Sequence, residues 1–79
     1  MRVQLGAVGS EAEAQREWDR IRKANGDVLG SLSPAFVRAD LGEKGVVYRI
    51  QAGPFATADA ATDICNKLKT RNVGCFVAR

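Results

Sequence analysis

The strongest constraint on the fold of this chain is an internal repeat. The segment that begins at Val3 aligns with the segment that begins at Ile50, 47 residues later in a chain of 79. The two segments read VQLGAVGS and IQAGPFAT, and each leads into a charged stretch that contains several alanines. Because self-similarity constrains topology more tightly than residue propensity does, we expect two structurally similar halves.

Each half begins with an alternating apolar pattern and continues with a helical one. The alternating positions predict strands that are buried on one face. The apolar positions that follow are spaced i, i+4, i+7 and predict helices over residues 11–24 and 58–70, with Ser10 and Thr57 as N-caps. The alternating positions are Val3, Leu5, Ala7 and Tyr48, Ile50, Ala52; the helical positions are Ala14, Trp18, Ile21 and Ala61, Cys65, Leu68.

The remaining segments complete a βαββαβ order. Residues 35–41 and 46–52 are typical of strands joined by a hairpin connection, and residues 75–78 of a last strand. Right-handed connections then favour an α+β fold of the split βαβ type, in which a four-stranded antiparallel sheet has two helices packed on one face. The first and third strands would be central. We expect residues 1–79 to be a single domain excised from a longer protein.

One face of this sheet is expected to stay uncovered. Amide and guanidinium donors beside an aromatic ring suit a ligand that carries hydroxyls, amides and carboxylates. The outward positions on the first, third and fourth strands have this character: Gln4, Val47, Arg49, Gln51 and Phe76. The pattern therefore indicates a binding face.

The second strand is also expected to alternate. Its apolar series predicts which side chains face the helices, and its other positions would then face outward. The inward positions would be Val37, Ala39 and Leu41, and the outward positions Phe36, Arg38 and Asp40. This phase would add Phe36 to the aromatic surface of the open side.

Composition argues against an enzyme. The chain has no histidine, which removes the usual general base at neutral pH and the commonest nitrogen ligand of zinc. Phosphate-binding loops, dinucleotide fingerprints and nucleophile motifs are absent from the sequence. We expect no catalytic residue, no metal site and no cofactor. No apolar run approaches the roughly 20 residues of a membrane span, so we expect no direct membrane insertion by this domain.

The net charge of +3 does not indicate nucleic acid binding. Most Lys and Arg residues lie in or beside the two predicted helices and alternate with acidic residues, which is typical of a solvated helical face. RNA recognition motifs share this element order and stack bases on aromatic side chains of the central strands. The matching positions here, Gln4, Val47, Arg49 and Gln51, are not aromatic.

Cys65 and Cys75 leave two interpretations open. Both lie on core-facing phases, and the short turn between them permits a disulfide. Free cysteine is also among the most buried residue types, so two reduced, buried thiols in a cytoplasmic protein fit equally well. Spacing alone does not decide between them.

Several segments, taken in order, resemble the SPOR (sporulation-related repeat) domain. The resemblance covers nearly the whole chain and depends on the joint order and spacing of segments that are individually weak. It implies a non-catalytic, peptidoglycan-binding module of a longer cell-envelope protein, whose membrane or lipid anchor lies outside this fragment. The segments are Val3 to Val8, Ala14 with Trp18, Asp40-Leu41-Gly42 with Gly45, Tyr48-Arg49-Ile50 with Gly53-Pro54-Phe55, and Cys65 through Leu68 to Gly74-Cys75.

The resemblance also implies binding residues. Family contacts on the sheet carry over to Gln4, Ala7, Val47, Arg49 and Phe76, with Ala7 where serine is often found and Val47 where an aromatic is often found. Phe36 and Phe76 would then supply the aromatic surface, and Gln51 lies nearby. Paired cysteines in many members imply a Cys65–Cys75 disulfide and hence an oxidising, periplasmic or cell-envelope location.

The resemblance further implies a ligand, a peptidoglycan glycan strand that lacks stem peptides, as found at the division septum. Removal of the stem peptide leaves a lactyl carboxylate on each muramic acid, and we hypothesise that Arg49 binds it while Gln4 binds an N-acetyl or hydroxyl group. The chain is expected to act as a monomer. The alternative is a protein–protein interaction domain of the cell envelope that uses its sheet face or an edge strand.

Overall fold

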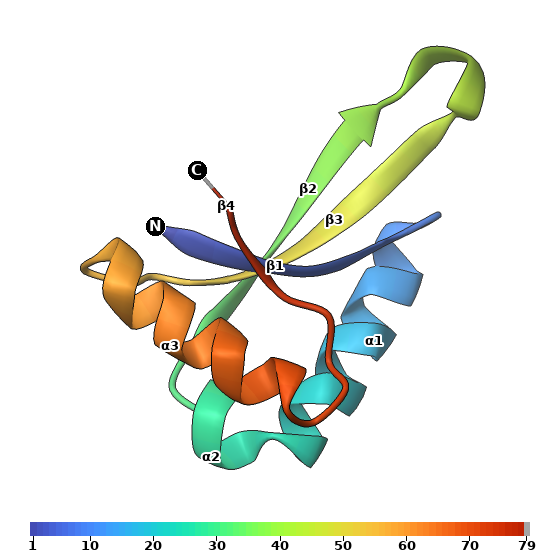
Figure 1. The fold of residues 1–79 in the computed structure, drawn as a ribbon. Coiled ribbons are helices and arrows are strands. Elements are labelled where there is room, and N and C mark those ends of the chain that lie inside the picture. Colours follow the sequence, from blue (N-terminus) through green and yellow to red (C-terminus); the bar gives the residue numbers. More distant parts are fainter. Residues whose placement is uncertain (79) are drawn as a thin grey trace.

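The computed structural model describes residues 1–78 and consists of one sheet with helices on one side (Figure 1). The sheet is antiparallel and four-stranded, with the order β2-β3-β1-β4. This confirms the α+β fold class and the central position of the first and third strands. The elements are β1 (Arg2–Val8), α1 (Glu11–Ala24), α2 (Gly26–Leu29), β2 (Ser33–Asp40), the 3₁₀ turn η1 (Gly42–Lys44), β3 (Val46–Gly53), α3 (Ala58–Lys69) and β4 (Phe76–Ala78).

Both long helices begin at side-chain caps. Ser10 Oγ accepts a hydrogen bond from the backbone N–H of Glu13 at 3.1 Å, and Thr57 Oγ1 accepts one from Ala60 at 3.1 Å. Each bond satisfies one of the backbone donors that an α-helix leaves free at its start. The two predicted N-caps are therefore confirmed, and they fix where each helix leaves the sheet.

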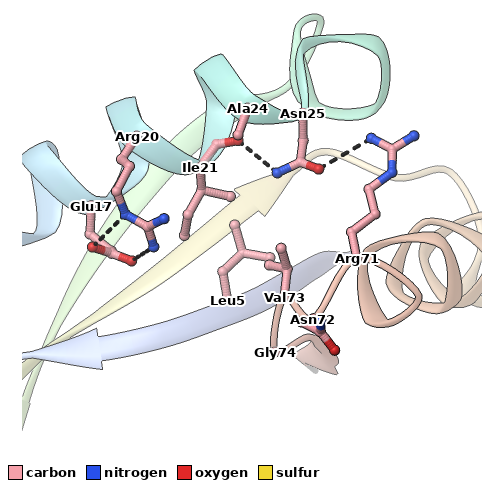
Figure 2. A pocket seen from close by; sticks show the side chains of 10 residues that line it. All are labelled: Leu5, Glu17, Arg20, Ile21, Ala24, Asn25, Arg71, Asn72, Val73 and Gly74. Carbon is pink, nitrogen blue, oxygen red and sulfur yellow. Dashed lines mark hydrogen bonds and ion pairs between the residues drawn. The ribbon is translucent and has the colours of Figure 1, made fainter.

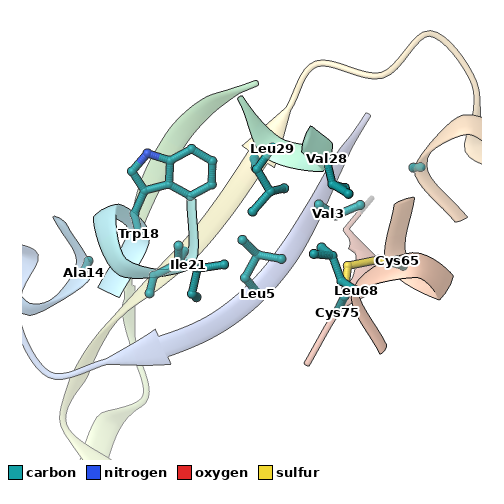
Figure 3. Close-up of a cluster of buried hydrophobic side chains, with 13 residues drawn as sticks. Val3, Leu5, Ala14, Trp18, Ile21, Val28, Leu29, Cys65, Leu68 and Cys75 are labelled. Atoms are coloured by element: carbon teal, nitrogen blue, oxygen red, sulfur yellow. A yellow bond between two sulfur atoms is a disulfide. The ribbon is translucent and has the colours of Figure 1, made fainter. Parts of the chain in front are cut away.

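A single hydrophobic core lies between the sheet and the helices (Figure 3). The predicted helical stripes face it, because Ala14, Trp18 and Ile21 of α1 are buried. Val3 and Ile50 supply the facing side of the central strands and are fully buried. The other buried apolar residues are Leu5, Val28, Leu29, Ala52, Ala61, Cys65, Leu68 and Cys75.

The short helix α2 was missed from the sequence. We predicted that the first helix ends at residue 24 and assigned no element to residues 27–29, but the chain forms one more helical turn there that buries Val28 and Leu29. Leu29 is among the largest fully buried side chains of the chain. Burial of an apolar side chain of this size contributes about 1.5–3 kcal/mol. This burial stabilises the separate turn that follows the end of α1 at Ala24.

The predicted phase of the second strand is wrong. Phe36 lies opposite Ile50 in the β2–β3 register, and Ile50 is buried against the helices. Phe36 is partly buried and packs on the core. Opposed residues of an antiparallel pair project to the same face, so Phe36, Arg38 and Asp40 lie on the helix side. Val37 and Ala39 consequently lie on the uncovered side, and Leu41 is exposed beyond the strand.

A β-bulge in β1 changes the phase of its second half. The β1–β3 register shifts between Gln4 and Gly6, so that two residues of β1 stand against Ile50. Beyond the bulge, Ala7 lies opposite Arg49 and is exposed. The expected alternation of Val3, Leu5 and Ala7 on one face is thus correct for the first two residues and wrong for Ala7.

A disulfide joins Cys65 of α3 to Cys75 just before β4. The sequence had left the choice between free thiols and a bridge open, and the bond between the two sulfur atoms is visible in Figure 3. The bridge holds the C-terminal half of α3 against the start of the edge strand β4, which pairs with β1 over three register positions within the described residues. The disulfide implied by the family resemblance is confirmed.

The β2–β3 hairpin extends past the part of the sheet that the helices cover (Figure 1). Its two strands pair over eight register positions, from Ser33 opposite Gly53 to Asp40 opposite Val46. The turn is closed by a bond from Leu41 N–H to Gly45 O, with Gly42 and Gly45 both at positive φ. Only glycine adopts such angles without strain. Because the hairpin extends past the helices, its outer end has solvent near both faces.

Candidate functional site

The sheet face without helices gathers the side chains that the sequence predicted for binding. We call this surface the open face, and we assign its members from the strand registers. It consists of Arg2, Gln4 and Ala7 of β1, Ala35, Val37 and Ala39 of β2, Val47, Arg49 and Gln51 of β3, and Phe76 and Ala78 of β4.

Two amide side chains form the centre of the open face. Gln4 and Gln51 are opposed in the register of the central strands, and Gln51 Nε2 donates to Gln4 Oε1 at 3.3 Å. This bond leaves the Gln4 amide nitrogen and the Gln51 amide oxygen without a partner among residues 1–78. The pair therefore presents both donors and acceptors to a ligand.

Arg49 lies beside the amide pair on β3. It is opposite Ala7 on one side and Val37 on the other, so small and aliphatic side chains flank it. Its guanidinium makes no hydrogen bond or ion pair with any side chain of residues 1–78, and the residue is half-buried. A planar guanidinium held without a partner on a flat surface can bind a carboxylate through two parallel hydrogen bonds.

Phe76 supplies the aromatic surface of the open face. It lies opposite Gln4 on β4 and is 56% exposed, which is high for a ring of this size. Val47 belongs to the same face, two residues before Arg49. Phe36 does not, because its ring packs on the core side of the sheet. The structure therefore brings together six of the seven predicted site residues: Gln4, Ala7, Val47, Arg49, Gln51 and Phe76.

The open face is cationic. Its two charged members, Arg2 and Arg49, are both basic, and the face contains no aspartate or glutamate among the strand residues that the structure describes. A hollow of about 390 Å³ lies at one end of it, lined by Met1, Arg2, Gln51 and Ala78. The surface therefore favours an anionic ligand over a cationic one.

A second cavity, of about 410 Å³, lies on the helix side (Figure 2). Arg20 forms an ion pair with Glu17, and Arg71 forms one with Asp27. Each guanidinium at this cavity therefore already has a carboxylate partner. The buried Asn25 donates to Ile21 O at 2.9 Å and accepts from Arg71 at 3.1 Å. Because its charges are neutralised internally, this cavity fits a structural role better than anion binding.

The pair of Arg71 and Asp27 predicts an acid-sensitive contribution to stability. Arg71 donates two hydrogen bonds to Asp27, at 2.8 and 2.7 Å. These bonds, helped by the charge of the guanidinium, lower the pKa of Asp27 from 3.8 to about 2. A lowered carboxyl pKa stabilises the fold above the unfolded-state value, and the benefit is lost as the pH falls from about 4 to about 2. Both side chains are well exposed, so solvent screening keeps the effect small.

We expect the melting temperature of Asp27→Asn to lie below that of the wild type at pH 6, and the difference to shrink as the pH is lowered to 2. Circular dichroism melts across this range measure it. Asp63→Asn is the matched control, since Asp63 is exposed on α3 and has no side-chain partner within residues 1–78. A difference between wild type and Asp27→Asn that is independent of pH would contradict the assignment.

Within residues 1–78 no three His, Cys, Asp or Glu side chains are grouped closely enough to hold a metal ion. None of the helices described is both long enough and apolar enough to span a bilayer.

The sequence reasoning missed part of the open face. Arg2 precedes Gln4 by two residues, and the same alternation that turned Gln4 outward could have identified it. Ala35, Val37 and Ala39 were assigned to the wrong face or not considered. The signal for the bulge was also present, because an isolated glycine such as Gly6 in a strand pattern is typical of one.

Comparison with known proteins identifies the family of this chain. The model of the SPOR domain family matches residues 1–79. Domains of this family are non-catalytic modules of cell-envelope proteins and bind peptidoglycan. The disulfide fits an oxidising compartment.

An uncharacterized protein of Rickettsia prowazekii (strain Madrid E) is 31% identical over 76 residues, which cover 96% of this chain and 34% of that protein. The chain thus spans about a third of that relative. No solved structure matches the chain. Because the family model covers its whole length, the chain belongs to the SPOR domain family.

Proposed function

We propose that the open face binds peptidoglycan glycan strands from which the stem peptides have been removed, and so directs its parent protein to the division septum. The observation that carries this proposal is the guanidinium of Arg49, which has no side-chain partner among residues 1–78 and lies beside the Gln4–Gln51 amide pair. The described strand residues of this face include no acidic one. A stripped glycan offers the matching groups: a lactyl carboxylate on each muramic acid, N-acetyl amides and hydroxyls.

Each part of the open face has a role in this binding. Arg49 holds the lactyl carboxylate through two charge-assisted hydrogen bonds. The free donor of Gln4 and the free acceptor of Gln51 bond the carbonyl and the N–H of an N-acetyl group. The exposed ring of Phe76 packs against the C–H face of a sugar. Ala7 and Val47 are small enough to let the glycan approach the sheet closely.

Discrimination against intact peptidoglycan follows from the same contacts. A stem peptide converts the lactyl carboxylate into an amide, which removes the charge that Arg49 binds. The peptide also adds bulk at the point where the ligand would touch the sheet. Binding is thereby disfavoured both by a lost attraction and by a steric clash.

The chain acts, in this proposal, as a monomeric domain of a longer envelope protein in the periplasm. Its match to about a third of a longer relative and its disulfide support this placement. An anchor or further domain would belong to the rest of that protein.

The proposal is tested by sedimentation with peptidoglycan sacculi before and after amidase treatment. We expect the wild-type domain to bind more strongly after treatment, and Arg49→Gln to weaken that binding by about 10- to 100-fold, since hydrogen bonds to charged groups contribute about 1.5–3 kcal/mol. Arg38→Gln is the matched control. It removes the same charge from the same sheet, but Arg38 lies opposite Tyr48 on the helix-side face.

Equal binding of the wild type to treated and untreated sacculi would contradict the discrimination, and full binding by a folded Arg49→Gln would contradict the role of Arg49. If the wild type binds neither preparation, the proposal fails and an interaction through the unpaired edge of β2 becomes the reading to pursue.

A further inference from the structure

We propose that Arg2 forms a second carboxylate-binding position on the open face, so that the face holds a linear polycarboxylate at two points along the strands. The inference rests on the proposed function, because Arg49 supplies the first position. It goes beyond it by assigning a residue that neither the sequence pattern nor the family resemblance had singled out, and by requiring a ligand with at least two carboxylates.

The placement of Arg2 follows from two observations. Arg2 lies opposite Ala78 in the β1–β4 register, two positions before Gln4 and on the same face. A Cβ built on Gly53 would lie 3.2 Å from Arg2 Cγ and 3.0 Å from the backbone oxygen of Met1. The missing side chain at Gly53 thus makes room for the stem of Arg2 against the end of β3.

The surroundings of Arg2 leave its charge available. Its guanidinium makes no ion pair or hydrogen bond to a side chain of residues 1–78, and no acidic residue belongs to the open face within that range. Arg2 lines the hollow of about 390 Å³ together with Gln51 and Ala78. The hollow joins the side chain of Arg2 to one end of the amide pair, which makes it a continuation of the site around Arg49.

The spacing of the two arginines sets the kind of ligand. Arg2 lies beside Gly53, four residues along β3 from Arg49, which corresponds to roughly 13 Å between their positions. The Gln4–Gln51 pair lies between them. A stripped glycan carries a carboxylate on every second sugar, an interval that two long, flexible arginine side chains can span. Two adjacent muramic acids can therefore be bound at once.

Bivalent binding has a measurable consequence. When the first carboxylate is bound, the second is held close to its arginine, so its binding becomes an intramolecular event. We expect the wild type to bind a stripped fragment with two muramic acids roughly 5- to 20-fold more tightly than a fragment with one, given the modest strength of exposed charge pairs. For Arg2→Gln we expect only an about twofold gain in affinity, because the longer fragment can place either of its two muramic acids at Arg49.

The experiment is isothermal titration calorimetry of the 79-residue chain with amidase-stripped fragments that contain one or two muramic acids. The variants are Arg2→Gln, Arg49→Gln and the control Arg38→Gln, each checked by circular dichroism for an unchanged fold. A two-muramic fragment whose carboxylates have been converted to amides forms the last arm. We expect the wild type to show no gain in affinity with this amidated fragment. We expect Arg38→Gln to show the same gain as the wild type with the unmodified two-muramic fragment.

The outcomes separate the two proposals. If Arg2→Gln keeps the full gain while Arg49→Gln loses affinity, the second position is wrong and the proposed function stands. The second position is equally wrong if the amidated fragment keeps the gain, because the extra contacts would then be to the sugars. If the wild type binds neither fragment, both proposals are overturned.

Discussion

Trp18→Ala is expected to bring the domain close to unfolding at 37 °C. Trp18 is only 3% exposed and packs from α1 into the core. Truncating a buried tryptophan to alanine costs about 3–5 kcal/mol, through lost burial and the cavity that remains. The total stability expected of a domain of this length is about 4–12 kcal/mol. The substitution would therefore remove a large part of it.

Urea denaturation of the two proteins measures this difference in the free energy of unfolding. Arg16→Ala is the control on the same helix, because Arg16 is exposed, has no side-chain partner within residues 1–78, and gains helix propensity when changed to alanine. Its stability should stay within about 0.5 kcal/mol of the wild type. A loss below about 1 kcal/mol for Trp18→Ala would mean that the helix does not depend on this contact.

Reduction of the Cys65–Cys75 disulfide is expected to lower the melting temperature by roughly 10–20 °C. The two cysteines are ten residues apart in the sequence, and closing a loop of that length stabilises a fold by about 2–3 kcal/mol in the chain-entropy account. For a domain of this size, each kcal/mol corresponds to roughly 4–8 °C. Thermal melts with and without a reducing agent measure the shift.

The double variant Cys65→Ser and Cys75→Ser provides the control. It should melt near the temperature of the reduced wild type and should show no further change when the reducing agent is added. If the reduced and oxidised proteins melt at the same temperature, the bridge contributes nothing to stability. The contribution of Cys65 and Cys75 to stability would then come from the packing of their buried side chains alone.

The sequence predicted those parts of the fold in which one face of an element is buried. Ala14, Trp18 and Ile21 form a stripe that faces a core, so their spacing reported the helix correctly. The same reason explains Val3, Ile50 and the central strands. The internal repeat then fixed the order of the elements. Periodicity works here because burial imposes it.

The failures occur where burial no longer imposes a pattern. Val37 and Ala39 of β2 lie on the open face of the sheet, so they do not need to face a core. Their apolar alternation therefore led to a wrong prediction of which side chains of β2 face the helices, and Phe36 was placed on the wrong face of the sheet. In β1 the bulge before Ala7 broke the period of two. These same errors account for the part of the candidate site that was misplaced.

The alternation along the central strands also determines how the open face can move. Gln4 follows the buried Val3 in the chain, and Arg49 and Gln51 enclose the buried Ile50. Each of these three side chains is thus the direct neighbour of a core residue and cannot shift far without disturbing the interior. The backbone amides of these strands should exchange with solvent deuterium only when the whole domain opens. A bound ligand would accordingly slow amide exchange throughout the sheet. Ligand binding would then be measurable as slower exchange of the most protected amides of the molecule.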